Sequence, residues 1–134
     1  MTRTVRAVDE LAVIALTLVP ALVLVGVLTW SVTKTNAHDD SVPNEWAGMR
    51  TTATKSSPEA WVRGHRAAVP AATTTMRLGV LAAVTALVLA LGSLVAEQIA
   101  VAALVVAIVG FVVVVVGCLY ACLVADRAAR NEAP

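Results

Sequence analysis

Charged and aromatic residues are scarce in this chain of 134 residues. Asp, Glu, Lys and Arg make up 14% of it and aromatic residues 4%, whereas 59% of the residues are hydrophobic. This composition leaves too little polar surface to cover a water-soluble globule of this size. It predicts an integral membrane protein in which residues 1–134 form a single membrane domain.

Cysteine is nearly absent, and both examples, Cys118 and Cys122, lie inside the last apolar run. They do not provide a disulfide framework of the kind that small secreted domains use. Their spacing of four places them on one helix face, but metal sites need three or four ligands and no His or further Cys joins them. We interpret both as packing residues. His38 and His65 likewise predict no metal site, because scattered His and Asp residues in a loop are usually solvated.

Sequence motifs of the common enzyme classes are absent as well. The chain has no Gly-rich phosphate loop, no Ser-x-x-Lys and no His-Glu-x-x-His. No charge stands in the middle of an apolar run, where transporters and proton channels normally place one. We therefore predict a protein that is not an enzyme, uses no cofactor, does not transport by itself and has no nucleic-acid partner.

Long apolar runs, by contrast, are abundant. The first covers about residues 11–32, near the length of about 20 residues that crosses a bilayer. A secretory signal peptide is the alternative, but its apolar region has only about 7 to 15 residues and ends in a cleavage site. No clean cleavage site follows this run. We predict an uncleaved span, in which neighbouring helices compensate for Pro20.

The second apolar stretch, Leu78 to Ala125, is interrupted only by Glu97-Gln98. As one helix it would be about 72 Å long at about 1.5 Å per residue, more than a bilayer can hold. We predict two antiparallel spans, about residues 78–96 and 99–125. Small residues recur at a spacing of four and predict close packing faces: Ala82, Ala86 and Ala90, then Ala103 and Ala107, then Gly117, Ala121 and Ala125.

Residues 33–77 form the only long polar connection. Ser57 is a candidate helix N-cap, Pro58 suits the first helical position, and Glu59 complements the helix dipole. Apolar and charged residues then separate onto two sides of a helix, which Pro70 should end or kink. The fold class is thus all-α, with three transmembrane helices and a short amphipathic interfacial helix near residues 58–69 in the first loop.

The basic residues are divided unequally between the two sides of the bilayer. Arg3 and Arg6 lie on one side, and the other eight of the ten Lys and Arg residues lie on the other. The positive-inside rule then predicts an external N-terminus, with loop 33–77 and the C-terminus cytoplasmic. Near anionic phospholipids, each exposed basic residue gains about 1 kcal/mol. We expect lipid headgroup contacts from Lys55, Arg63 and Arg66.

The loop also contains a pattern of polar and small residues: Asn44, Gly48, Met49, Arg50, Thr51 and Thr54, followed by Trp61 and His65. This order and spacing resembles the Asn-x-x-x-Gly-hydrophobic-Arg-Thr-x-x-Thr signature of the SdpI family of bacterial membrane proteins. The two following spans also match. Met49 replaces the commoner Ile or Leu, Thr52 stands where Pro is frequent, and the six spans of the name-giving member are absent.

The resemblance implies a non-catalytic protein of the bacterial plasma membrane, active in immunity against a peptide toxin or in signalling. Its partner-binding residues would be Asn44, Gly48, Arg50, Thr51, Thr54, Trp61 and His65. Gly48 would allow a positive φ or a close backbone approach, and Arg50 would clamp a carboxylate or phosphate.

Two questions remain open at the level of sequence. We expect residues 44–54 to fold back so that Arg50 or a threonine hydroxyl hydrogen-bonds His65; the alternative is a neutral His65 among headgroups. The alternative function is an accessory subunit, packed through its small-residue faces against another membrane protein in a larger complex.

Overall fold

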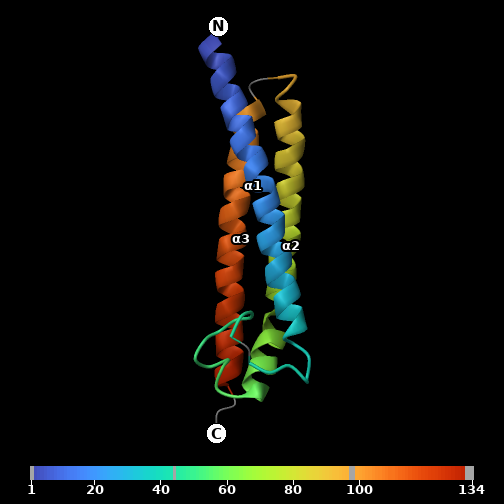
Figure 1. The fold of residues 1–134 in the computed structure, drawn as a ribbon, viewed down its shortest axis with the longest axis vertical. Helices are drawn as coiled ribbons and strands as arrows, with labels where there is room; N and C mark the ends of the chain where they lie inside the picture. Colours follow the sequence, from blue (N-terminus) through green and yellow to red (C-terminus); the bar gives the residue numbers. More distant parts are fainter. Residues whose placement is uncertain (1, 44, 97–98, 132–134) are drawn as a thin grey trace.

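Three long helices run side by side in the computed structural model, which describes residues 2–43, 45–96 and 99–131 (Figure 1). They are α1 (Thr2–Thr35), α2 (Pro58–Gly92) and α3 (Ile99–Arg130). All three are long and apolar enough to cross a membrane, and the described residues contain no strand. The predicted all-α architecture with three spans is confirmed. The predicted break at Glu97-Gln98 lies outside the described residues.

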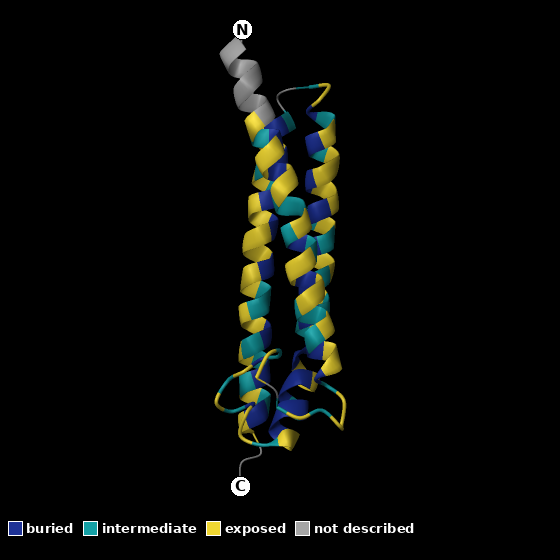
Figure 2. Cartoon of the chain, viewed as in Figure 1, coloured by how far each residue is buried: buried dark blue, intermediate teal, exposed yellow. Residues whose placement is uncertain are grey.

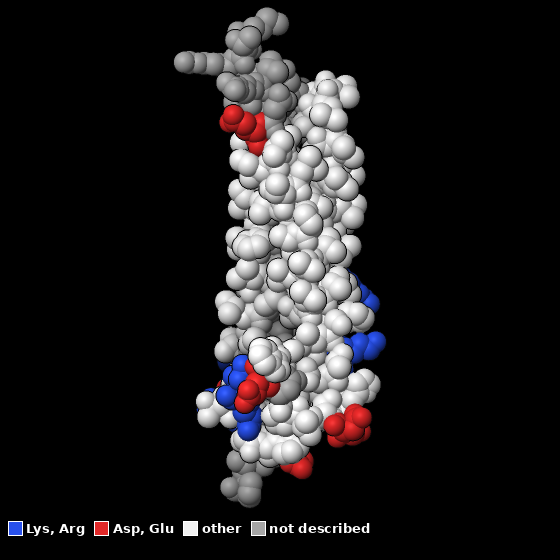
Figure 3. Space-filling view, in the orientation of Figure 1, with Lys and Arg blue, Asp and Glu red and all other residues white. Residues whose placement is uncertain are grey.

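The outer surface of the bundle is apolar, as lipid contact requires. Valine and leucine side chains project outward along every helix, for example Leu24, Val88 and Val112. Figure 2 shows buried residues facing the bundle axis and exposed residues facing out. Figure 3 shows a long band without charged side chains, bounded by charged zones toward both ends. This band is the part of the molecule that would lie in the hydrocarbon core.

Small residues fill the bundle interior, as their spacing predicted. Ala86 and Ala90 of α2 pack with Ala103 and Ala107 of α3 in a cluster that also includes Ala15. The helices approach so closely at Gly110 that an added Cβ would lie 2.5 Å from the Ala82 Cβ. Such contact increases dispersion attraction, which drives helix association in lipid. The small-residue faces are therefore used within the chain.

The polar connection is shorter than its sequence suggested. Ser57 does cap α2, accepting a hydrogen bond from the Ala60 N–H at 3.1 Å, and Pro58 begins the helix. The expected interfacial helix, however, is not a separate element. Its residues form the first turns of α2, which continues without interruption through Pro70 to Gly92. Burial of Ala68 and Ala72 against the bundle holds these turns in line.

Candidate functional site

Residues 36–43 and 45–57 fold over one end of the bundle, beside the C-terminal end of α3 (Figure 1). We call this segment the loop cap. The N-terminus is at the opposite end of the molecule.

His65 is the centre of the contact between the loop cap and α2. The Met49 N–H donates to His65 Nε2 at 2.8 Å, and His65 Nδ1 lies 2.9 Å from the Trp61 carbonyl oxygen. A carbonyl only accepts and an amide N–H only donates, so the proton is on Nδ1 and the ring is neutral. The ring is fully buried. A charged imidazolium would lose its bond to Met49.

Trp61 connects the same centre to α1. Its ring is fully buried and lies against the His65 ring, with centroids 4.2 Å apart. The indole N–H donates to Asn36 Oδ1 at 3.2 Å, and Asn36 Nδ2 donates to the Val32 carbonyl at 2.9 Å. Buried indoles generally need such a partner. Trp61 is therefore a buried link that connects α2, through Asn36, to the end of α1.

Gly48 permits this close approach. Its φ of +123° belongs to a region that side-chain-bearing residues rarely adopt. A Cβ there would lie 2.6 Å from Trp61 Cη2 and 2.8 Å from His65 Nε2. Both reasons that the sequence offered for a glycine, the positive φ and the close approach, apply at this position.

Two threonines fix the turn that follows. The Thr51 N–H donates to the Thr54 hydroxyl at 3.0 Å, and the Thr54 N–H donates to the Thr51 hydroxyl at 3.1 Å. The buried Thr54 hydroxyl in turn donates to the Met49 carbonyl. Met49 is thus held through its N–H by His65 and through its carbonyl by Thr54. Such side chain to backbone bonds stabilise turns at the expense of regular structure.

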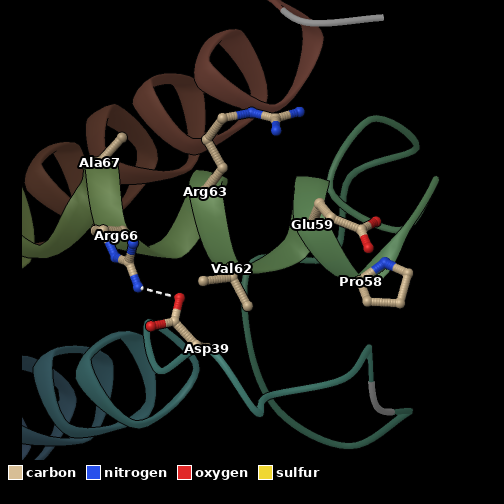
Figure 4. Close-up of a pocket in the computed structure, with 7 residues that line it drawn as sticks. All are labelled: Asp39, Pro58, Glu59, Val62, Arg63, Arg66 and Ala67. Atoms are coloured by element: carbon tan, nitrogen blue, oxygen red, sulfur yellow. Dashed lines mark hydrogen bonds and ion pairs between the residues drawn. The ribbon is translucent and has the colours of Figure 1, made fainter.

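The three basic residues expected to contact lipid headgroups, Lys55, Arg63 and Arg66, have different environments at the loop-cap end of the bundle. Arg63 donates to the carbonyls of Ala128 and Ala129 at 3.1 and 3.3 Å, at the C-terminal end of α3. Arg66 pairs with Asp39 at 2.7 Å across a cleft (Figure 4). Lys55 is exposed. Arg63 therefore contributes to the fold, and headgroup contact by any of the three stays a prediction.

The structure brings together five of the seven motif residues: Gly48, Thr51, Thr54, Trp61 and His65. Asn44 lies outside the described residues, and Arg50 is exposed. The loop segment folds back over His65 as expected, but its hydrogen bond comes from the Met49 amide and not from Arg50 or a threonine hydroxyl. Asn36 was not among the residues predicted from the sequence. An amide residue at the end of the first apolar run was the only available signal.

The two cysteines occupy packing positions. Cys118 Sγ lies 3.4 Å from Thr29 Oγ1 between α3 and α1, and Cys122 packs beside the Met49 cluster. Both thiols are half-buried.

The three helices and the loop cap together define a small three-helix membrane protein with a polar surface, the loop cap, at one end. The model of the SdpI/YfhL protein family matches residues 42–121, which include most of the loop cap, all of α2 and most of α3. The chain therefore belongs to the SdpI/YfhL protein family. Neither a curated protein nor a solved structure matches it.

Proposed function

We propose that this protein is a non-catalytic immunity or toxin-sensing protein of the bacterial plasma membrane, and that it engages its partner through the loop cap. Family membership supports the general role. The charge distribution favours a cytoplasmic loop cap and C-terminus with an external N-terminus.

One observation carries the proposal: the loop cap is a preorganised polar surface whose buried groups are already paired. Among the described residues, every buried side-chain nitrogen or oxygen has a hydrogen-bond partner. Met49 bonds to His65 through its N–H and to Thr54 through its carbonyl. A rigid surface of this kind loses little entropy on binding. It suits recognition better than catalysis.

Arg50 is the motif residue best placed to contact a partner. It follows Met49 directly, so the hydrogen bonds of Met49 fix the point from which its side chain projects, and that side chain is exposed. Its planar guanidinium can bind a carboxylate in a bidentate manner. We propose that Arg50 contacts an acidic group of the partner while the other motif residues hold it in position.

Expression of the chain in toxin-sensitive bacteria tests this function. Cells would be challenged with a panel of membrane-active peptide toxins, and the concentration that kills half of them measured. We expect wild-type protein to raise that concentration for at least one peptide. Arg50→Ala should abolish most of the protection at unchanged membrane levels, since truncating one partner of a charge pair that is buried in a complex costs about 2 to 5 kcal/mol of binding free energy.

Lys55→Ala is the matched control, because Lys55 is an exposed basic residue of the same loop cap. It should leave protection within about twofold of wild type. Equal losses from both substitutions would mean that general surface charge, and not the position of Arg50, matters. Absence of protection against every peptide would count against the immunity role.

The alternative, an accessory subunit of a larger complex, loses much of its structural basis. It relied on small-residue faces free for a partner, yet Ala86, Ala90, Ala103 and Ala107 pack against one another within the chain. Mild detergent extraction followed by quantitative analysis of co-purifying proteins separates the two roles. A partner in fixed stoichiometry would favour the subunit.

A further inference from the structure

Two cavities of different polarity meet on one side of the bundle. The first is a cleft of about 550 Å³ beside the start of α2, lined by Asp39, Glu59, Val62, Arg63, Arg66 and Ala67. Figure 4 shows its charged side chains and the ion pair across it. The second is a groove of about 630 Å³ between α2 and α3. Ala67 lines both, so the two cavities adjoin at this residue.

The groove is apolar and runs along the membrane-facing surface. Its α2 wall extends from Ala67 through Pro70 and Thr74 to Leu78, and its α3 wall carries valines and Tyr120. At about 1.5 Å per residue, the distance along α2 from Ala67 to Leu78 is roughly 16 Å. That is about half of a hydrocarbon core of about 30 Å. The groove is therefore too short to hold a crossing helix.

The polar cleft supplies a cation next to this groove. Arg66, whose side chain is 59% exposed, pairs with Asp39, which is 91% exposed. Surface ion pairs between such exposed groups contribute little, so a competing anion can replace the carboxylate. An arginine in the cleft and an apolar groove beside it are complementary to an amphiphile with an anionic head.

We propose that the cleft and the groove together bind one anionic phospholipid, with its phosphate on Arg66 and one acyl chain between α2 and α3. The site is independent of the toxin-related role and lies apart from Arg50.

Native mass spectrometry of the full chain tests the site, after extraction in the presence of equal amounts of phosphatidylglycerol and phosphatidylcholine with identical chains. We expect about fivefold preferential retention of phosphatidylglycerol. Arg66→Gln should abolish the preference. Asp39→Asn should increase it, because the competing carboxylate is removed. Arg127→Gln is the control, since Arg127 is exposed at the same end and lines neither cavity.

The acyl-chain half of the site is tested with Ala67→Leu, which fills the junction from an exposed position. It should reduce retention of both lipids, whereas Ala102→Leu, at an exposed site on α3 away from the groove, should not. Equal retention of the two lipids by wild type would overturn the proposal. So would equal effects of Arg66→Gln and Arg127→Gln, equal effects of the two leucine substitutions, or displacement of the lipid by inorganic phosphate alone.

Discussion

Gly48 is the residue on which the contact between the loop cap and α2 depends. Its positive φ and its lack of a side chain both serve the hydrogen bond from the Met49 N–H to His65. Gly48→Ala should therefore destabilise the protein by roughly 1 to 3 kcal/mol, through backbone strain and a clash with the Trp61 and His65 rings. Thermal unfolding in detergent would measure the loss.

The same contact predicts coupling between Gly48 and His65. When His65 is replaced by alanine, the methyl group added by Gly48→Ala no longer meets Nε2. The destabilisation caused by Gly48→Ala should therefore be smaller by roughly 1 kcal/mol in the His65→Ala protein. Gly92→Ala is the control, because a Cβ at Gly92 would meet its nearest neighbour at an ordinary 3.8 Å. Strictly additive effects at Gly48 and His65 would contradict the observed packing.

Sequence and structure agree on part of this cluster for a physical reason. His65 lies on the apolar side of an amphipathic helix, so its burial and its cover by residues 44–54 were predictable. The donor itself was not, because every residue except proline carries the same amide and only the path of the backbone decides which one reaches the ring. Arg50, the more distinctive side chain, is exposed instead.

At the scale of elements, the first turns of α2 and the last turn of α3 stabilise each other. The last carbonyls of a helix have no partner within it, and the guanidinium of Arg63 supplies donors to those of Ala128 and Ala129. A cation there also interacts favourably with the helix dipole. This contact explains why the charged side chain of Arg63 is directed toward the end of α3.

Arg63→Ala should therefore fray the end of α3, at a cost of about 1 to 2 kcal/mol. Hydrogen exchange measured by mass spectrometry should show faster exchange at residues 126–131 and little change in the spans. Arg130→Ala provides the comparison. Its guanidinium is exposed and pairs with Asp126 of the same helix at 2.7 Å, so its removal should have a smaller effect. An equal effect of both substitutions would argue against the role given to Arg63.

The continuity of α2 shows where local sequence signals are insufficient. Pro70 and the polar turns before it predicted a separate interfacial helix, since proline removes a helical hydrogen bond. Tertiary packing outweighs that loss: Ala68 and Ala72 are fully buried, so the helix continues. The three apolar runs were predictable because bilayer thickness imposes their length.

At the scale of the whole molecule, the two ends of the bundle differ in both structure and charge. The loop cap and the C-terminal end of α3 share one end of the bundle, and the N-terminus is at the other (Figure 1). An uncharged band separates the two ends (Figure 3). Seven of the ten Lys and Arg residues belong to the loop end or to the helix segments next to it, and Arg77 lies farther along α2. By the positive-inside rule, that end should face the cytoplasm.

Single-cysteine labelling tests this orientation. After Cys118→Ser and Cys122→Ser, Asp40→Cys places a thiol in the exposed loop cap and Glu10→Cys places one near the opposite end of the band. A membrane-impermeant maleimide should label the Glu10 variant in intact cells and the Asp40 variant only after permeabilisation. Labelling of the Asp40 variant in intact cells would reverse the orientation. The loop cap would then face the exterior, and Arg50 would meet a secreted toxin directly and not a cytoplasmic partner.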